Sequence, residues 1–268
     1  MRIRDGLGCR VLVTGAGGFI GSHLTELLVR EGFEVRAFVH YNSAGSWGWL
    51  DHCQNDLKGH FEVICGDIRD PYGVKHAMQA CDAVMHLAAL IAIPFSYHSP
   101  DIYVETNIKG TLNVLQAARD LAIDRIVQTS TSEVYGDPEI HPQPESYKGS
   151  VNTLGIRSCY DEGKRIAETL CSDYKRVHNL DVKIVRIFNT YGPRMMKNDG
   201  RVVSNFIVQA LCNEPITIYG DGKQTRSFCY VEDLINGLCL AMNSSYEGAL
   251  NLGNPEEFTI RELAALIK

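Results

Sequence analysis

Val-Leu-Val-Thr-Gly-Ala-Gly-Gly-Phe-Ile-Gly, at residues 11–21, joins a short apolar run to a glycine-rich turn, and a helical apolar pattern begins at Phe19. Gly15, Gly18 and Gly21 lack the Cβ atoms that would block a tight turn, the approach of a pyrophosphate and helix–strand packing. The first N–H groups of the following helix are free to bind an anion. No Gly-Lys-Ser/Thr follows, which argues against the phosphate loop of nucleotide triphosphatases. The stretch therefore predicts a dinucleotide-binding turn between a strand and a helix.

The sequence around this turn alternates between short β-branched apolar runs and longer helical patterns. We expect strands at residues 10–14, 35–39, 61–65, 83–87, 125–129 and 182–187. We expect helices at residues 19–30, 71–80, 101–121 and 161–178. Strands in series with helical crossovers are typical of a parallel sheet covered by helices. The chain is therefore predicted to have an α/β fold, a doubly wound parallel sheet of the NAD(P)-binding Rossmann type.

The composition of the sequence changes beyond Asn189, where Gly, Pro, Asn and Asp separate shorter elements. This change predicts two domains, a dinucleotide-binding Rossmann domain at residues 1–188 and a smaller α/β region at residues 189–268 over the strand ends. The uncharged stretch at residues 83–100 contains His86 and Pro94. It is interpreted as a buried strand followed by a loop, not as a membrane span.

The composition excludes several classes of protein. The 268 residues include 26 Lys+Arg and 32 Asp+Glu, a formal net charge of −6, and 45% are hydrophobic. This hydrophobic content is too high for disorder, and the acidic balance argues against nucleic acid, which needs a basic face, as a partner. The nine cysteines include no C-x-x-C pair, and no His/Cys cluster has zinc-ligand spacing. Residues 1–6 lack the apolar core of a secretory signal. We therefore expect a cytoplasmic protein with reduced thiols, no metal site and no membrane partner.

Three further places on the predicted strands bear on the cofactor. An acidic residue near the end of the second strand normally binds the adenosine ribose, but here that place reads Val-His-Tyr-Asn and ends at Asn42. The missing carboxylate leaves NADP open beside NAD. Asp67 and Ile68, after the third strand, could receive the adenine edge, although Asp67 could equally cap a helix. Small residues follow the fourth strand, where it would pass beneath the diphosphate and nicotinamide, at Leu87, Ala88 and Ala89.

Tyr160 and Lys164 are four residues apart and so lie on one face of a helix. A tyrosine that acts as a general base must lower its pKa from about 10 toward neutrality, which a nearby cation favours. The fifth strand leads into Thr131, Ser132 and Glu133 at the edge where doubly wound folds bind ligands. These hydroxyls could bind a sugar oxygen that passes between alcohol and ketone, and the carboxylate could orient a proton. A solvated strand-end turn is the alternative.

Together these motifs resemble the extended short-chain dehydrogenase/reductases that act on nucleotide sugars. Within that family, residues 130–268 resemble the UDP-glucuronate decarboxylases. The stretches that carry this resemblance are Ser-Thr-Ser-Glu-Val-Tyr-Gly-Asp-Pro-Glu (130–139), Cys-Tyr-Asp-Glu-Gly-Lys-Arg (159–165), Arg-Ile-Phe-Asn-Thr-Tyr-Gly-Pro-Arg-Met (186–195), Asn-Asp-Gly-Arg-Val-Val-Ser-Asn-Phe (198–206) and Gln-Thr-Arg-Ser-Phe (224–228). The first half, with Trp-Gly-Trp at residues 47–49 and Leu-Ile-Ala-Ile-Pro-Phe at residues 90–95, resembles nucleotide-sugar 4,6-dehydratases.

The resemblance implies a mechanism that depends on NAD. Tyr160, assisted by Lys164, would take the C4 hydroxyl proton of UDP-glucuronate as hydride passes to NAD⁺, and the resulting 4-ketone would lose the C6 carboxylate as CO₂. Thr131 and Tyr160 would hold the enolate oxygen, while Ser132 and Glu133 would orient the ring and the proton that reaches C5. Return of the hydride to C4 would give UDP-xylose with no net oxidation.

The resemblance also implies the binding residues. The cofactor would contact Gly15, Gly18, Phe19, Ile20, Gly21, Asn42, Asp67, Ile68, Leu87, Ala88, Ala89, Thr106, Tyr160 and Lys164. The nucleotide sugar would contact Asn189, Val203, Tyr219, Gln224 and Arg226, the last facing the diphosphate. Because the net charge is −6, positive potential for two diphosphate ligands would be local, from the glycine-turn amides, Lys164, Arg226 and Arg194. A homodimer through the helices at residues 101–121 and 161–178 is expected from the family.

Two other functions remain open. The first half and the Thr-Ser-Glu loop are compatible with a nucleotide-sugar 4,6-dehydratase or 4-epimerase acting on a GDP- or UDP-hexose. A catalytically impaired NAD-binding mosaic or truncated chain is the second alternative. Family members continue past Leu-Gly-Asn-Pro-Glu-Glu (252–257), and that tail normally brings a further substrate-binding arginine, whereas this chain ends at residue 268. The resemblance therefore implies that residues 189–268 form a nucleotide-sugar-binding region that is incomplete at its C-terminus.

Overall fold

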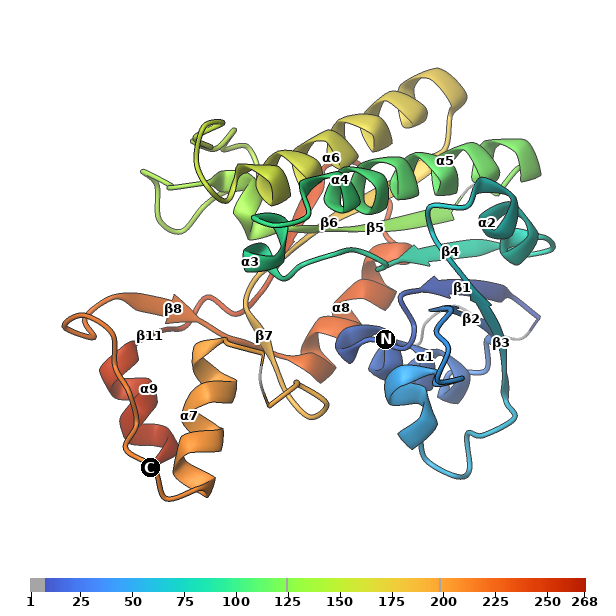
Figure 1. The fold of residues 1–268 in the computed structure, drawn as a ribbon. Coiled ribbons are helices and arrows are strands. Elements are labelled where there is room, and N and C mark those ends of the chain that lie inside the picture. Colours follow the sequence, from blue (N-terminus) through green and yellow to red (C-terminus); the bar gives the residue numbers. More distant parts are fainter. Residues whose placement is uncertain (1–7, 124, 198) are drawn as a thin grey trace.

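A parallel sheet forms the centre of the molecule in the computed structural model, which describes residues 8–123, 125–197 and 199–268 (Figure 1). Seven strands lie in the order β10-β6-β5-β4-β1-β2-β3, and all neighbours pair in parallel. The strands are β1 (Arg10–Thr14), β2 (Glu34–His40), β3 (Phe61–Gly66), β4 (Ala83–His86), β5 (Arg125–Thr131), β6 (Asp181–Ile187) and β10 (Ala249–Leu252). The strand order reverses between β1 and β4, and doubly wound sheets bind ligands beyond the carboxyl ends of the strands at this point.

Helices cover both faces of the sheet (Figure 1). Alternate residues of β1 point to opposite faces. Val11 and Val13 enter one core with leucines of α1 and α8, and Leu12 enters the other with side chains of α2, α5 and α6. The helices of these layers are α1 (Phe19–Arg30), α8 (Val231–Met242), α2 (Pro71–Met78), α5 (Gly110–Leu121) and α6 (Ser158–His178). The predicted α/β fold class is confirmed.

The predicted elements of the first 188 residues are confirmed within three residues at each end, with two differences. The helix expected at residues 101–121 consists of α4 (Pro100–Tyr103), a π-helical segment η2 (Val104–Lys109) and α5. The stretch after β4, interpreted as a loop, contains the short helix α3 (Ile93–Ser96). Both differences lie beside the edge where ligands of such folds bind, and π turns are frequent at functional sites.

Two elements beyond residue 188 belong to the sheet layer. β10 pairs with β6, so that Ala249 lies opposite Ile184. On α8, a Cβ at Gly237 would lie 2.5 Å from Leu252 Cδ1, which shows how closely this helix approaches β10. The prediction of six strands missed β10, because its sequence Ala-Leu-Asn-Leu contains none of the β-branched residues that mark the predicted strands. The predicted boundary at residue 188 therefore does not coincide with the edge of the sheet.

The rest of the chain after residue 188 forms a small region at one side of the sheet, with α7 and α9 side by side (Figure 1). Its core consists of Val203, Phe206, Phe228, Ile260 and Leu263. β8 and β11 pair antiparallel, whereas β7 and β9 pair in parallel. Its elements are β7 (Thr190–Tyr191), α7 (Val202–Leu211), β8 (Thr225–Ser227), β9 (Cys229–Tyr230), β11 (Glu257–Thr259) and α9 (Ile260–Ile267).

Two global features bear on the expectations about location. No helix within the described ranges is both long and apolar enough to cross a membrane. All nine cysteines fall in the described ranges and are free thiols. The prediction that residues 1–6 do not form a secretory signal concerns a stretch outside the described residues.

Candidate active site

The glycine-rich turn lies where several backbone segments meet. Gly15 has a left-handed conformation (φ +69°), and a Cβ there would lie 2.9 Å from the Ala88 nitrogen. A Cβ on Gly21 would lie 2.2 Å from the Gly15 carbonyl oxygen. The Gly18 N–H donates to the same oxygen at 3.0 Å and closes the turn at the start of α1. Only glycine tolerates these approaches, and the resulting cradle at a helix N-terminus fits a pyrophosphate.

A buried chain of hydrogen bonds ties this turn to the end of β4. Thr14 Oγ1 accepts from the N–H groups of Leu87 and Ala88, at 3.1 Å each, and therefore donates its own proton to His86 Nδ1 at 2.7 Å. The His86 ring then carries its proton on Nε2, which donates to Thr111 Oγ1 at 3.3 Å. Burial lowers the pKa of His86 to about 3. The His86 ring therefore stays neutral at physiological pH, and the donor and acceptor roles along this series of hydrogen bonds do not change.

Asn107 holds the same segment from the other side. Its side-chain amide donates to the Leu90 carbonyl oxygen at 2.9 Å, and its side-chain oxygen accepts from the Leu90 N–H at 2.8 Å. Asn107 lies in the π-helical segment η2, next to the partly buried Thr106. The segment with Ala88 and Ala89 is therefore fixed at both ends, close to the glycine turn.

The other residues predicted to bind the cofactor lie around the same edge but have partners of their own. The Asn42 amide donates to the Ser46 carbonyl oxygen at 2.7 Å and shapes its own loop. Asp67 pairs with Arg69, whose hydrogen bond holds the pKa of the carboxyl below its ordinary value. Ile68 is buried against Gly110 of α5. The remaining two, partly buried at the start of α1, are Phe19 and Ile20.

Tyr160 and Lys164 lie on α6, and both side chains are buried. Lys164 Nζ donates to the Thr129 carbonyl oxygen at 3.0 Å, and burial lowers the pKa of Lys164 to about 8. Burial raises the pKa of Tyr160 to about 12, although a hydrogen bond with Thr131 acts in the opposite direction. The lowered tyrosine pKa expected from the Tyr-x-x-x-Lys spacing is therefore wrong for this structure. Dehydration of the phenolate dominates, and the ammonium group is engaged by a carbonyl.

The Thr-Ser-Glu loop lies beside this pair. Thr131 ends β5, and the next residues form the short helix η3 (Ser132–Tyr135). Thr131 Oγ1 accepts from the Glu133 N–H at 3.3 Å, and the Glu133 carboxylate pairs with the Arg157 guanidinium. The structure thus brings the predicted hydroxyls, phenol and carboxylate together at the end of β5.

Asp161 is an acid of this site that sequence reasoning did not single out. Its side chain is 6% exposed, and Oδ1 has no hydrogen-bond partner within the described ranges. Burial, and then the negative charge of Glu133, raise the pKa of Asp161 to about 6, whereas Arg157 acts to lower it. Its position directly after Tyr160 was a signal that could have drawn attention to it.

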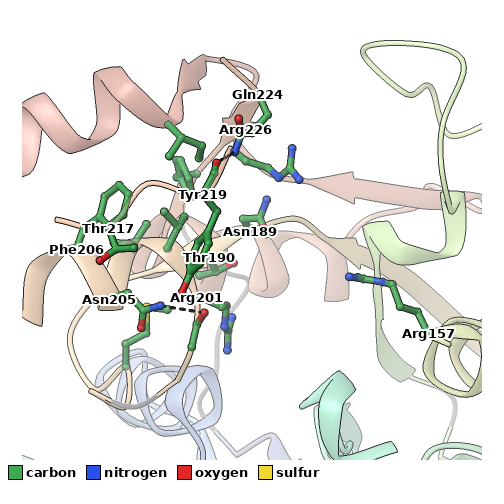
Figure 2. A pocket seen from close by; sticks show the side chains of 16 residues that line it. Arg157, Asn189, Thr190, Arg201, Asn205, Phe206, Thr217, Tyr219, Gln224 and Arg226 are labelled. Atoms are coloured by element: carbon green, nitrogen blue, oxygen red, sulfur yellow. Dashed lines mark hydrogen bonds between the residues drawn. The ribbon is translucent and has the colours of Figure 1, made fainter. Parts of the chain in front are cut away.

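A cavity of about 440 Å³ opens between the start of α6 and the small region (Figure 2). All five residues predicted to bind the nucleotide sugar line it, namely Asn189, Val203, Tyr219, Gln224 and Arg226. Figure 2 shows Gln224 and Arg226 at one end and Arg157 alone on the opposite side. Sequence reasoning did not single out Arg157 and Arg201, which also line the cavity. A lone arginine gives no periodic signal, so only the fold could reveal them.

Two of the cations expected to supply positive potential have protein partners. Arg194 pairs with Glu26 at 2.6 Å, and the two side chains are 14% and 11% exposed. Lys164 is bound to a carbonyl, as described above. Of the predicted cations, Arg226 lines the cavity, and Arg157 and Arg201 accompany it there. The positive charge at the cavity therefore comes largely from residues that the sequence did not indicate.

A buried ion pair supports the catalytic loop from behind. Arg186 of β6 donates to both oxygens of Glu168 on α6, at 3.0 and 2.8 Å. Arg186 also donates to the Tyr135 hydroxyl at 2.9 Å, which in turn donates to Asn251 Oδ1 at 2.6 Å. Ser130 Oγ donates to Glu168 at 2.5 Å. This network joins β5, β6, β10 and α6, and therefore fixes η3 relative to Tyr160.

Comparison with known proteins places this geometry in a family. Residues 12–267 match the family model described as GDP-mannose 4,6 dehydratase. The chain belongs to this family. It is an extended short-chain dehydrogenase/reductase of the nucleotide-sugar type, as the sequence motifs indicated.

Curated relatives and a solved structure refine the comparison. The chain is 48% identical over 263 residues to UDP-glucuronic acid decarboxylase 3 of Arabidopsis thaliana, covering 97% of the chain and 73% of that protein. It is 47% identical over 262 residues to UDP-glucuronic acid decarboxylase 1 of Danio rerio, covering 97% of the chain and 60% of that protein. The chain thus spans about three fifths of the length of the zebrafish relative. UDP-glucuronic acid 4-epimerase of Bacillus cereus, in complex with UDP-glucuronic acid and NAD, superposes with a TM-score of 0.81 and 29% identity, covering 96% of this chain and 82% of that one.

Asp161→Asn is expected to raise the melting temperature at pH 8, because asparagine keeps the shape of the side chain and removes a charge that is costly to bury. The folded-state pKa of Asp161, about 6, lies above its ordinary value of 3.8. The loss of folding stability caused by the buried Asp161 charge is therefore absent below about pH 4 and complete above about pH 6. We expect a gain of about 2–6 °C at pH 8 and none at pH 4, measured by differential scanning calorimetry.

Glu162→Gln is the matched control, because Glu162 neighbours Asp161 on α6 but is solvent-accessible and pairs with Arg165. This variant should show no comparable gain. A loss of stability in Asp161→Asn at pH 8, or an equal gain at both pH values, would contradict the assignment.

Proposed function

We propose that the chain carries the cofactor-binding and sugar-binding machinery of a UDP-glucuronate decarboxylase, which forms UDP-xylose and CO₂. The observation that carries this proposal is identity of 47–49% to curated decarboxylases over nearly the whole chain. The arrangement of the site supports it, because Arg157, which lines the cavity, pairs with Glu133 of the Thr-Ser-Glu loop beside Tyr160.

NAD is the proposed cofactor, as in the complex of the Bacillus cereus epimerase. Gly15, Gly18 and Gly21 would hold its pyrophosphate, since no side chain fills their cradle. The proposed contacts extend to Phe19, Ile20, Asn42, Asp67, Ile68, Leu87, Ala88, Ala89 and Thr106. The bound cofactor would accept a hydride from C4 of the sugar and return it at the end of the reaction. The partners of Asn42 are main-chain atoms of its own loop, and the sequence Val-His-Tyr-Asn at residues 39–42 contains no carboxylate that would oppose a 2′-phosphate.

The chain's own residues would manage protons and charge around the sugar. Tyr160 would take the proton of the C4 hydroxyl, with Lys164 and Thr131 stabilising the phenolate. The ketone formed at C4 is β to the C6 carboxylate, so the C5–C6 bond can break and release CO₂, leaving its electron pair on an enolate. Thr131 and Tyr160 would donate hydrogen bonds to the enolate oxygen. Ser132 and Glu133 would orient the ring and the solvent-derived proton that reaches C5.

Protonation of C5 restores the ketone, and Tyr160 then returns its proton to the C4 oxygen as that carbon is reduced. The UDP portion would lie in the cavity against Asn189, Val203, Tyr219, Gln224 and Arg226. The guanidinium of Arg226 would face the diphosphate. The region after residue 188, apart from α8 and β10, is thus the proposed sugar-nucleotide region.

Incubation of the protein with UDP-glucuronate and NAD⁺ tests the proposed function. We expect release of CO₂ and formation of a UDP-pentose, which mass spectrometry detects. The second candidate is a 4,6-dehydratase or 4-epimerase, which the match to the GDP-mannose 4,6 dehydratase model favours. A 4-keto-6-deoxy or epimerised product from a GDP- or UDP-hexose, without CO₂ from UDP-glucuronate, would establish this alternative. Binding of NAD without turnover of any nucleotide sugar would favour an impaired chain.

Tyr160→Phe is expected to abolish turnover, at least about 100-fold, because the C4 proton loses its acceptor. Cofactor affinity should remain nearly unchanged, since the aromatic ring keeps its packing against Tyr103. Steady-state CO₂ release and NAD titration measure the two effects. Tyr72→Phe, at an exposed position, is the control and should keep full activity. Near-normal activity of Tyr160→Phe would remove Tyr160 from the mechanism.

Two copies of the chain are proposed to associate through α4, α5 and α6 in the cytoplasm. Apolar side chains exposed on α4, η2 and α6 support the interface, namely Ile102, Val104, Ile166 and Val177. Free thiols on all nine cysteines agree with a reducing compartment. Sedimentation velocity at micromolar concentration should give a dimer mass, and Ile166→Glu should shift the protein toward the monomer. A monomeric wild-type protein would refute the interface.

A further inference from the structure

Arg157 is the one side chain in the described ranges that both lines the cavity and pairs with the catalytic loop. It lies on the opposite side of the cavity from Gln224 and Arg226 (Figure 2). Its guanidinium pairs with Glu133, the carboxylate proposed to act on the sugar ring. A ligand held at the far end of the cavity would therefore meet Arg157 as it extends toward the catalytic loop.

The position of Arg157 along the chain places it one helical turn before Tyr160, the proposed base. Its carbonyl oxygen accepts the Tyr160 N–H at 3.0 Å, so it immediately precedes the first turn of α6. Asp161 and Glu133 are both close enough for their charges to act on the guanidinium. A sugar ring whose C4 hydroxyl meets Tyr160 would consequently present its neighbouring substituents to Arg157.

The three arginines of the cavity differ in how firmly they are held. Arg201 donates to both oxygens of Asp199, a carboxylate whose side chain is 14% exposed. Arg226 donates to the Thr225 carbonyl oxygen at 2.7 Å, at the nucleotide end. The Arg157 side chain is 49% exposed, and its pair with Glu133 engages a single nitrogen. Its remaining N–H groups can therefore bind a second acceptor, and an arginine fork matches a carboxylate.

We propose that Arg157 binds the C6 carboxylate of the sugar, and that it does so by exchanging Glu133 for the substrate. The inference rests on the proposed function, since it assumes a hexuronate in the cavity. It identifies the group by which the site selects an acidic sugar over a neutral one. The exchange would also release the Glu133 carboxylate toward the ring, where it would orient the solvent-derived proton that reaches C5 after the substrate has bound.

The exchange reverses when the reaction is complete. Loss of CO₂ removes the carboxylate that competes with Glu133, so the Arg157–Glu133 pair can form again. A UDP-pentose would then be held by its nucleotide alone. Arg157 is thus expected to distinguish the substrate from the product of the same reaction, which differ by this one group.

Ligand titration with NAD⁺ present tests this inference on Arg157→Gln and Arg157→Lys. We expect Arg157→Gln to weaken binding of UDP-glucuronate by about 10- to 100-fold, the effect of a lost charge-assisted hydrogen bond. Binding of UDP-xylose and UDP-glucose should change by less than about twofold. Lysine should restore part of the difference, because it keeps the charge but not the fork. Arg30→Gln, at an exposed arginine at the end of α1 and outside the proposed interface, is the control and should behave as wild type.

Glu133→Gln provides a test of opposite sign. Removing the competing carboxylate should tighten UDP-glucuronate binding several-fold while CO₂ release falls, and UDP-xylose binding should stay unchanged. A merely structural role for Arg157 would weaken all three ligands alike and would give no tightening in Glu133→Gln.

Separate outcomes overturn the inference and the proposed function. Equal loss of UDP-glucuronate and UDP-xylose affinity in Arg157→Gln, or loss of discrimination in Arg201→Gln instead, would overturn the role of Arg157. So would a wild-type protein that binds the two ligands equally. If the preference for UDP-glucuronate over UDP-xylose depends on Arg157 but no CO₂ is released, Arg157 remains the carboxylate-binding residue and the proposed decarboxylation is rejected.

Discussion

The hydroxyl of Thr14 holds together the point on which the rest of the site depends. It accepts two backbone N–H groups from the end of β4 and donates to His86, so β1 and β4 are joined where the strand order reverses. This contact brings Ala88 against Gly15, at a separation that leaves no room for a Cβ. The cradle at the start of α1 exists because these two backbones approach so closely.

Burial, more than charge pairing, sets the protonation states around this point. His86, Lys164 and Tyr160 all lie in the protein interior. Burial lowers the pKa of His86 and Lys164 and raises that of Tyr160, and each shift favours the neutral form of the side chain. The free energy that is lost when a charged group is desolvated in the interior exceeds the free energy gained from an opposite charge several ångströms away. The tyrosine therefore keeps its proton in this structure. A phenolate would require further stabilisation of its negative charge, which a bound substrate and cofactor could provide by excluding water and adding hydrogen bonds.

The cavity has a different electrostatic character from this interior. Three arginines line it although the whole chain carries a net charge of −6. Positive potential is thus concentrated where a diphosphate and a sugar carboxylate would lie, while acidic residues are spread elsewhere. Three acidic residues are exceptions, because Asp199 pairs with Arg201, and Glu133 and Asp161 share Arg157 at the boundary between the cavity and the buried tyrosine. This boundary is where we propose that substrate charge replaces protein charge.

The sequence by itself determined the first six strands and the glycine turn, and its resemblance to the nucleotide-sugar enzymes indicated five of the residues that line the cavity. The strands depend on local signals, because apolar periodicity defines a strand, whereas a motif such as Gln-Thr-Arg-Ser-Phe is informative only through the resemblance. Only the tertiary structure decided that β10 completes the sheet, that Arg194 is taken by Glu26, and that Arg157 meets Glu133. It also reversed the expected shift of the Tyr160 pKa. Each of these depends on burial or on a charge distant in the chain, and no local pattern of residues records either.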